Sequence, residues 1–157
     1  MTWVHRDELS YNIATGQYEP RWTRMQLTAL ERKPIILDLP VPPSVNKLRR
    51  LNKAALRAYE RWKQVADAIV TAHWAAMKFR GTGRPTLAGE RVVVSIYISE
   101  RARLDADNAH KALMDYLTRI EVISDDRKRF VRRIITEWVP PDQAPQGVRI
   151  VVAPYYL

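Results

Sequence analysis

The alternation between residues 90 and 99 is the feature that most constrains the fold, because Val92, Val94, Ile96 and Ile98 occupy every second position. Successive side chains of a β-strand point to opposite faces, so this spacing predicts a strand with one apolar face. The apolar face of a sheet has to be buried against another layer of secondary structure. The run therefore predicts a sheet that is covered on one side.

Two segments have the periodicity of amphipathic helices. The first covers residues 53–79, and the second begins at Asp105 or Asp107 and continues to Thr118. In the first segment, the apolar residues that recur at helical spacing are Leu56, Tyr59, Val65, Ile69, Ala72, Ala76 and Phe79. In the second, the expected buried stripe consists of Ala109, Ala112, Leu113, Tyr116 and Leu117.

Three further strands are predicted at residues 34–41, 130–138 and 148–153, and proline and glycine residues interrupt the chain between them. The order strand, helix, strand, helix, strand, strand predicts an α+β fold with a mixed sheet of about four to five strands covered by two helices. This single domain is expected over residues 34–157. Residues 1–33 carry a turn signal at Ala14-Thr15-Gly16, so we expect an N-terminal hairpin or arm there.

The charge balance favours a polyanionic partner, because 26 Lys and Arg residues against 17 Asp and Glu residues give a formal charge of +9. Nucleic acid is the leading candidate. The absence of cysteine excludes disulfides and thiolate zinc sites, so a metal ion must be bound by oxygen or imidazole. No apolar run is long enough to span a bilayer, and charged residues occupy positions 5–8, which predicts a cytoplasmic protein without a membrane partner.

Acidic residues are concentrated where the alternating strand is expected to give way to the second helix. Asp105 and Asp107 lie at that junction, and Asp125 and Asp126 fall in the turn before the next strand. Magnesium prefers hard oxygen ligands and is often bound by one or two protein carboxylates. Carboxylates among many Arg and Lys residues therefore suit metal-assisted phosphodiester hydrolysis, provided that the connection after the helix folds back toward the first pair.

Each part of this pattern also has an ordinary structural explanation. Asp105 or Asp107 could cap the helix, and Asp125-Asp126 could form a turn. Lys111 lies four residues after Asp107, so it could form an intrahelical salt bridge worth about 0.3 to 0.5 kcal/mol. In the functional interpretation, Lys111 instead binds the scissile phosphate.

Three segments together resemble the signature blocks of the RusA family of Holliday junction resolvases, the crossover junction endodeoxyribonucleases. They occur in the family's order over roughly residues 34–153, and the second block has the pattern D-x-D-N-x-x-K. The segments are Pro42-Pro43-Ser44-Val45-Asn46, Arg103-Leu104-Asp105-Ala106-Asp107-Asn108 with Lys111-Ala112-Leu113-Met114-Asp115, and Val122-Ile123-Ser124-Asp125-Asp126. The chain departs from the pattern at Glu121, where a Gly is common, and at Lys128, where a Gln is common.

The resemblance implies a homodimeric, magnesium-dependent enzyme that cuts four-way DNA junctions by paired symmetric nicks, with Mn²⁺ as a candidate substitute for Mg²⁺. It assigns the catalytic and metal-binding carboxylates to Asp105, Asp107 and Asp126, the essential lysine to Lys111, and a secondary ligand position to Asp125. The residues expected to contact DNA are Asn46, Lys47, Arg49, Arg50, Arg101, Arg103, Asn108, Arg127, Lys128, Arg132 and Arg133.

Two other functions are compatible with the same residues. One is a non-catalytic protein that binds branched DNA and whose acidic cluster is structural. The other is a metal-dependent nuclease that prefers other branched nucleic acids. Magnesium-dependent nicking of a synthetic junction separates the first from an enzyme, and a comparison of substrates at matched salt identifies the second.

Overall fold

A computed structural model describes residues 9–12, 17–20, 34–44, 52–76 and 85–155 of the chain. The chain divides into two compact units, one formed by residues 1–33 with 156–157 and the other by residues 34–155. In the first unit, strands β1 (Leu9–Asn12) and β2 (Gln17–Pro20) pair antiparallel, as expected for a hairpin. The predicted turn at residues 14–16 lies outside the described residues.

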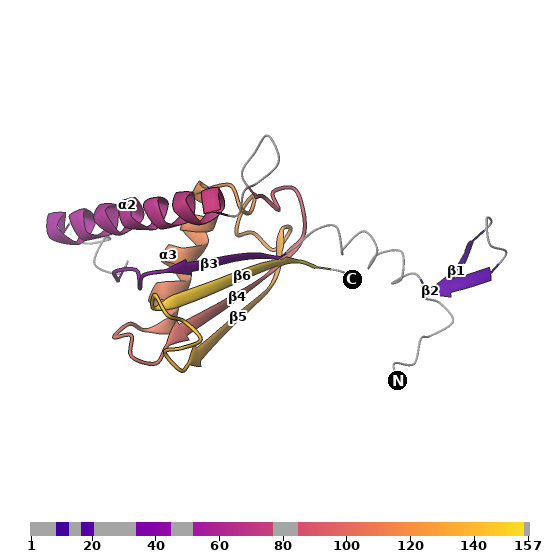
Figure 1. Cartoon of the computed structure of the whole chain (residues 1–157). Helices are drawn as coiled ribbons and strands as arrows, with labels where there is room; N and C mark the ends of the chain where they lie inside the picture. Colours follow the sequence, from indigo (N-terminus) through magenta and orange to yellow (C-terminus); the bar gives the residue numbers. More distant parts are fainter. Residues whose placement is uncertain (1–8, 13–16, 21–33, 45–51, 77–84, 156–157) are drawn as a thin grey trace. The chain divides into compact units, whose positions relative to one another are not determined.

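The second unit contains one four-stranded mixed sheet, in agreement with the predicted α+β fold (Figure 1). Its strands are β3 (Ile35–Leu39), β4 (Val92–Ser99), β5 (Val131–Val139) and β6 (Val148–Pro154), arranged in the order β3-β6-β4-β5. β6 pairs antiparallel with both β3 and β4, whereas β4 and β5 are parallel. β3 and β5 are therefore the edge strands.

Helices α2 (Lys53–Ala76) and α3 (Ala106–Arg119) contribute to the core on one face of the sheet. The predicted alternation in β4 is confirmed, because Val92, Val94, Ile96 and Ile98 are fully buried while the intervening side chains are partly exposed. The stripe predicted for α3 is also confirmed, since all five of its residues are buried. No helix in the described part of the chain combines the length and apolarity needed to cross a bilayer.

The buried face of α2 differs from the predicted one. Leu56 and Val65 were expected in the core but are 53% and 52% exposed. The buried residues are instead Trp62, Ala66, Val70 and Trp74, which follow one another at intervals of four. The two indole rings bury more apolar area than Leu or Val side chains can, so their spacing determines which face of α2 packs against the sheet.

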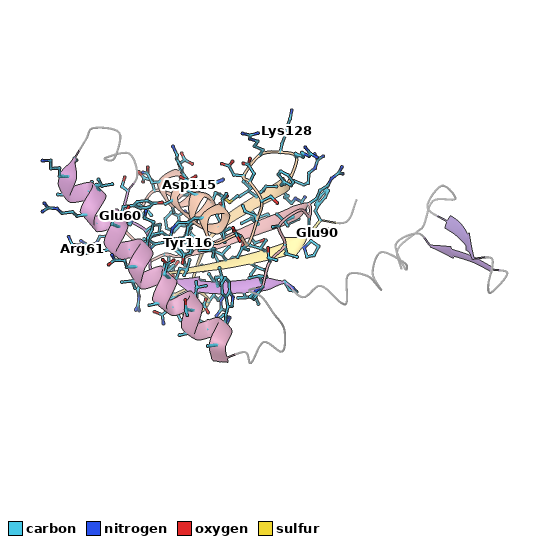
Figure 2. All side chains as sticks on the ribbon, turned by 90° about the horizontal axis from the view of Figure 1, so that it is seen from above. Glu60, Arg61, Glu90, Asp115, Tyr116 and Lys128 are labelled. Carbon is cyan, nitrogen blue, oxygen red and sulfur yellow. The ribbon has the colours of Figure 1, made fainter. Side chains whose placement is uncertain are left out.

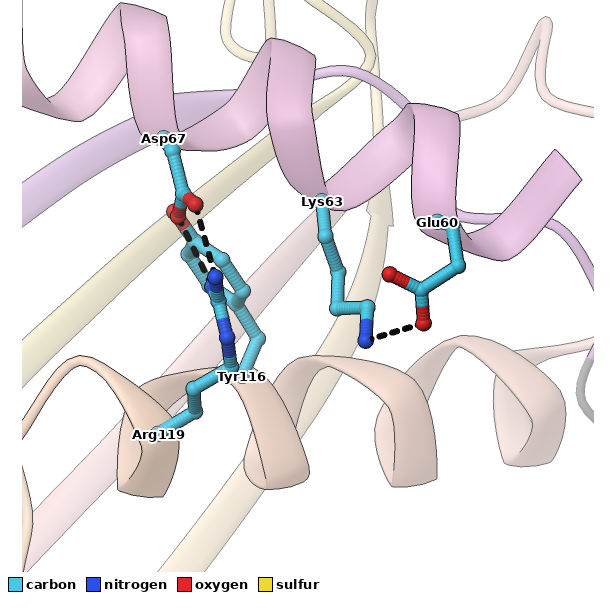
Figure 3. A network of polar contacts seen from close by, with 5 residues as sticks. All are labelled: Glu60, Lys63, Asp67, Tyr116 and Arg119. Carbon is cyan, nitrogen blue, oxygen red and sulfur yellow. Dashed lines mark hydrogen bonds and ion pairs between the residues drawn. The ribbon is translucent and has the colours of Figure 1, made fainter. Parts of the chain in front are cut away.

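Contacts between α2 and α3 fix the position of the helix that follows the first acidic block. Tyr116 donates a hydrogen bond to Asp67 Oδ1 at 2.9 Å, and Arg119 forms a bidentate ion pair with the same carboxylate at 2.7 and 2.8 Å (Figure 3). Trp62 packs edge-on against the Tyr116 ring with centroids 5.2 Å apart, and its indole N–H donates to the Pro40 carbonyl. These contacts hold α3 against α2 and the loop after β3.

Candidate functional site

Asp105 occupies the N-cap position of α3, but its carboxylate makes no capping hydrogen bond. Its backbone carbonyl accepts the first helical hydrogen bonds, from the N–H groups of Asn108 and Ala109. Asp107 lies in the first turn of the helix, and both carboxylates are exposed. The capping explanation therefore does not account for the Asp105 side chain, which is left to face solvent at the positive end of the helix dipole.

The turn between β4 and α3 is held in place by Ser99, the last residue of β4. Its backbone N–H donates to the Gly147 carbonyl at 2.8 Å, and its hydroxyl accepts from the Arg101 N–H at 3.3 Å. Gly147 has φ of 118°, and a Cβ atom there would lie 2.7 Å from the Val41 side chain, so only glycine fits. The turn directs Arg101 and Arg103 to the surface on the way to Asp105.

The second acidic block follows the C-terminal end of α3. The helix ends in a Schellman motif, in which the N–H of Val122 donates to the Leu117 carbonyl and the N–H of Glu121 donates to the Thr118 carbonyl. Glu121 has φ of 61°, a conformation that favours glycine. This is the position where the RusA pattern commonly has Gly, so the departure changes the residue while the backbone keeps the conformation that glycine allows.

Asp125 and Asp126 form a hydrogen-bonded pair of carboxyl groups. The hydrogen bond with Asp125 raises the pKa of Asp126, and desolvation and the negative charges of Asp125 and Asp115 raise it further. Desolvation also tends to raise the pKa of Asp125, but the hydrogen bond from Asp126, the Arg127 N–H and the Arg127 guanidinium lower it overall. Arg127 Nε lies 3.0 Å from Asp125 Oδ2. Of the two carboxyl groups, Asp126 therefore has the raised pKa and Asp125 the lowered pKa.

The structure does not bring the two acidic blocks together within one chain. Asp105 follows the C-terminal end of β4, whereas Asp126 precedes the N-terminal end of β5. Because these strands are parallel, with Val92 opposite Val131 and Ser99 opposite Val139, the two attachment points lie at opposite ends of the sheet. The eight residues of β4 span about 23 Å at about 3.3 Å per residue. Over the described residues, no three Asp, Glu or His side chains are grouped to hold a metal ion.

Asp115 is the acidic residue of α3 whose charge affects Asp126, and it was not among the candidate ligands predicted from the sequence. It lies eight residues after Asp107 and four after Lys111, and all three side chains are exposed along one side of the helix (Figure 2 labels Asp115). Within the described part of the chain, Lys111 forms no ion pair with Asp107 or Asp115. The four-residue spacing from Asp107 to Lys111 to Asp115 was the sequence signal that could have identified Asp115 as a neighbour of the acidic blocks.

Basic residues flank both acidic blocks. Arg101 and Arg103 are exposed beside Asp105, and Asn108 is partly exposed in α3. Near Asp126, an exposed basic segment extends from the loop into β5 and consists of Arg127, Lys128, Arg129, Arg132 and Arg133. Figure 2 shows Lys128 projecting from this loop. Asn46, Lys47, Arg49 and Arg50, which were also expected to contact DNA, lie outside the described residues.

Comparison with known proteins does not assign the chain to a family. No family model matches the sequence, and no curated protein matches it.

Proposed function

We propose that the protein is a magnesium-dependent endonuclease that acts on four-way DNA junctions as a homodimer. The observation that carries this proposal is the pair of acidic blocks at the surface, exposed Asp105 with Asp107 and partly exposed Asp125 with exposed Asp126, each flanked by exposed basic residues. Carboxylates of this kind would repel DNA unless a cation neutralised them, whereas the basic residues attract its phosphates. The junction as substrate rests on the resemblance to the RusA family alone.

The separation of the two blocks favours a site that is shared between two copies. Carboxylate oxygens are suitable ligands for Mg²⁺, but a single chain holds Asp105 and Asp107 at one end of the β4 and β5 pair and Asp126 at the other. A two-fold axis that reverses the direction of one copy relative to the other can place Asp126 of one copy near Asp105 and Asp107 of the other. Such a dimer would contain two equivalent sites.

In this proposal, Asp105, Asp107 and Asp126 hold the metal ion, and Asp125 is a secondary ligand. Bound Mg²⁺ supplies neutralisation of charge on the scissile phosphate and activation of a water molecule, and Mn²⁺ is expected to substitute. Lys111, one turn after Asp107 on α3, positions the phosphate through its ammonium group. Arg101, Arg103, Arg127 and Lys128 bind the flanking backbone on either side of the scissile bond.

The proposal is tested with the full chain and a synthetic four-way junction. We expect paired nicks that require Mg²⁺, and we expect Asp105→Asn and Asp126→Asn each to reduce nicking by about 10³-fold or more while junction binding is retained. Glu60→Gln, which removes a carboxylate from an exposed position of α2 outside both blocks, serves as the matched control. Nicking that persists in either aspartate variant would contradict the assigned residues.

The principal alternative is a branched-DNA-binding protein without catalytic activity. It is favoured by the absence of a three-carboxylate group among the described residues of one chain. Junction binding without nicking in Mg²⁺ or Mn²⁺, at protein concentrations at which the dimer forms, would support it. A comparison of junction, flap, duplex and RNA substrates at matched salt tests the remaining alternative, a nuclease for other branched nucleic acids.

A further inference from the structure

The outer edge of β5 is an exposed sheet edge that carries two large apolar side chains. β5 pairs only with β4 in the described sheet, so its other edge has no strand partner there. Ile134 and Trp138 are 37% and 49% exposed, although they lie opposite the buried residues Val94 and Ile98 of β4. A long, partly apolar edge strand of nine residues is a template for pairing with another strand.

The backbone groups available on this edge belong to the even-numbered residues. The Val139 carbonyl accepts from the Glu100 N–H at 2.9 Å, so Val139 directs its backbone groups toward β4. Backbone groups alternate in direction along a strand, and therefore Arg133, Ile135 and Glu137 also face β4. Ile134, Thr136 and Trp138 direct their N–H and C=O groups outward, where a second strand can receive them.

We propose that this edge pairs antiparallel with the same edge of a second copy, about a two-fold axis that passes by Ile135. In this register, Arg133 faces Glu137 of the other copy, and by symmetry this pair of opposite charges occurs twice. Ile135 faces its own counterpart, and Ile134 faces Thr136. Opposite charges and apolar side chains placed directly across an antiparallel pair stabilise it.

Registers shifted by two residues match the side chains less well. A two-fold axis at Thr136 places the carboxylate of Glu137 opposite Ile135 and leaves Arg133 opposite Val139. Isolated charges on an edge strand normally discourage pairing with other chains. In the register centred on Ile135, Arg133 and Glu137 each face an oppositely charged residue of the other copy. These two residues therefore favour this register over the shifted ones, in which they face apolar side chains.

This pairing has a direct consequence for the acidic blocks, and only in this respect does it rest on the proposed function. It brings the N-terminal end of β5 in one copy, where the register with β4 shifts between Val131 and Arg133, alongside the end of the other copy's β5 that carries Val139. Asp126 lies five residues before Val131, and Val139 is hydrogen bonded to the residue after β4, from which the chain leads to Asp105. An axis perpendicular to the sheet keeps the helices of both copies on the same face. The pairing therefore carries Asp126 of one copy toward Asp105 and Asp107 of the other, twice in each dimer.

Disulfide trapping tests the pairing directly, because the natural chain contains no cysteine. At the proposed axis, the two Ile135 positions form a non-hydrogen-bonded pair with Cα atoms about 4.5 Å apart, a separation compatible with a disulfide. We expect Ile135→Cys to form a covalent dimer rapidly under mild oxidation. Ile36→Cys is the matched control, because Ile36 is 44% exposed on β3 at the opposite edge of the sheet. Equal cross-linking rates for the two variants would overturn the proposal.

A charge exchange provides a second measurement that does not depend on cysteine. We expect Arg133→Glu to weaken dimerisation by about tenfold, because it places like charges opposite each other at two positions of the interface. The double variant Arg133→Glu with Glu137→Arg should return the dissociation constant to within about threefold of the natural value, as measured by analytical ultracentrifugation. Equal weakening in the single and double variants would contradict the register.

The outcomes separate this proposal from the proposed function. Cross-linking at Ile135 without metal-dependent nicking would support the interface and reject the nuclease. Nicking by a chain that does not cross-link at Ile135 would retain the nuclease and reject the interface. In the case where both hold, the covalent Ile135→Cys dimer should nick junctions at a rate within about threefold of the natural dimer, because the trapped geometry is the active one.

Discussion

The two ends of the β4 and β5 pair differ in how they present their carboxylates. At the end that leads into α3, Asp105 and Asp107 are exposed at a helix N-terminus, and the Asp105 side chain makes no capping bond. At the other end, Asp125 and Asp126 share a hydrogen bond, and Arg127 forms an ion pair with Asp125. Each end thus holds two acidic residues and neighbouring arginines, but among the residues that the structure describes neither end forms a group of three metal-binding side chains.

Under the proposed function, each end would be half of a site. A helix N-terminus favours negative charge, and Asp105 and Asp107 are both placed there. At the other end, the hydrogen bond between Asp125 and Asp126 raises the pKa of Asp126 and lowers the pKa of Asp125. A divalent cation would reduce the repulsion between these carboxylates. Two copies arranged about a two-fold axis would combine one half of each kind at each site.

The largest expected effect comes from mixing two inactive variants. When Asp105→Asn and Asp126→Asn chains are co-expressed, a mixed dimer keeps one site with all three carboxylates if the site is shared between copies. About half of the dimers are mixed and each has one intact site, so we expect about a quarter of the natural single-strand nicking rate, from parents that are nearly inactive. Nicking that stays at the level of the parents would place each site within one chain.

The next largest effect is expected at Lys111, which lies on α3 between Asp107 and Asp115. Lys111→Met should reduce the single-turnover rate of nicking by about 10²-fold, because the ammonium group no longer stabilises charge on the phosphate. Lys111→Arg keeps the charge and should retain more activity than Lys111→Met. A substantial fall in junction affinity with no change in the rate at saturation would show instead that Lys111 serves only in binding.

A smaller effect is expected from removing pairs of basic residues at either end. We consider two double variants, one with Arg101→Ala and Arg103→Ala and the other with Arg127→Ala and Lys128→Ala. Each should reduce the slope of log affinity against log salt concentration by about 0.9 for every phosphate that the variant no longer neutralises. If the two ends form halves of one site, the two double variants should lose similar amounts of affinity for the junction. A loss of junction affinity in only one of the two double variants would show that the two ends do not contribute equally to DNA binding.

The smallest effect is expected at Asp115. Its charge raises the pKa of Asp126, but it lies on α3 two turns away from Asp107 and is not assigned as a ligand. Asp115→Asn should therefore change the nicking rate by less than about twofold. A loss as large as that of Asp126→Asn would indicate that Asp115, Asp125 and Asp126 form a local metal site within one chain.

Much of the fold could be predicted from the sequence because local periodicity reports which side chains are buried. The alternation in β4 and the stripe of α3 identified the correct buried faces, and the proline and glycine breakers located the ends of the strands within one or two residues. The face of α2 was predicted incorrectly. Its pattern contains apolar residues on more than one side, and only packing against the sheet selects the face with Trp62 and Trp74.

The acidic residues themselves, and the basic residues around them, were determined by the sequence. Which of them lie close together was decided by the tertiary structure. The spacing between Asp107 and Asp126 left open whether the chain folds back toward the start of α3, and this depended on the direction of β5. Since β5 pairs parallel to β4, its N-terminal end lies beside that of β4, and Asp126 is held away from Asp105 by the length of the strands. Strand direction is set by hydrogen bonds between segments that are distant in the sequence, so no local pattern contains it.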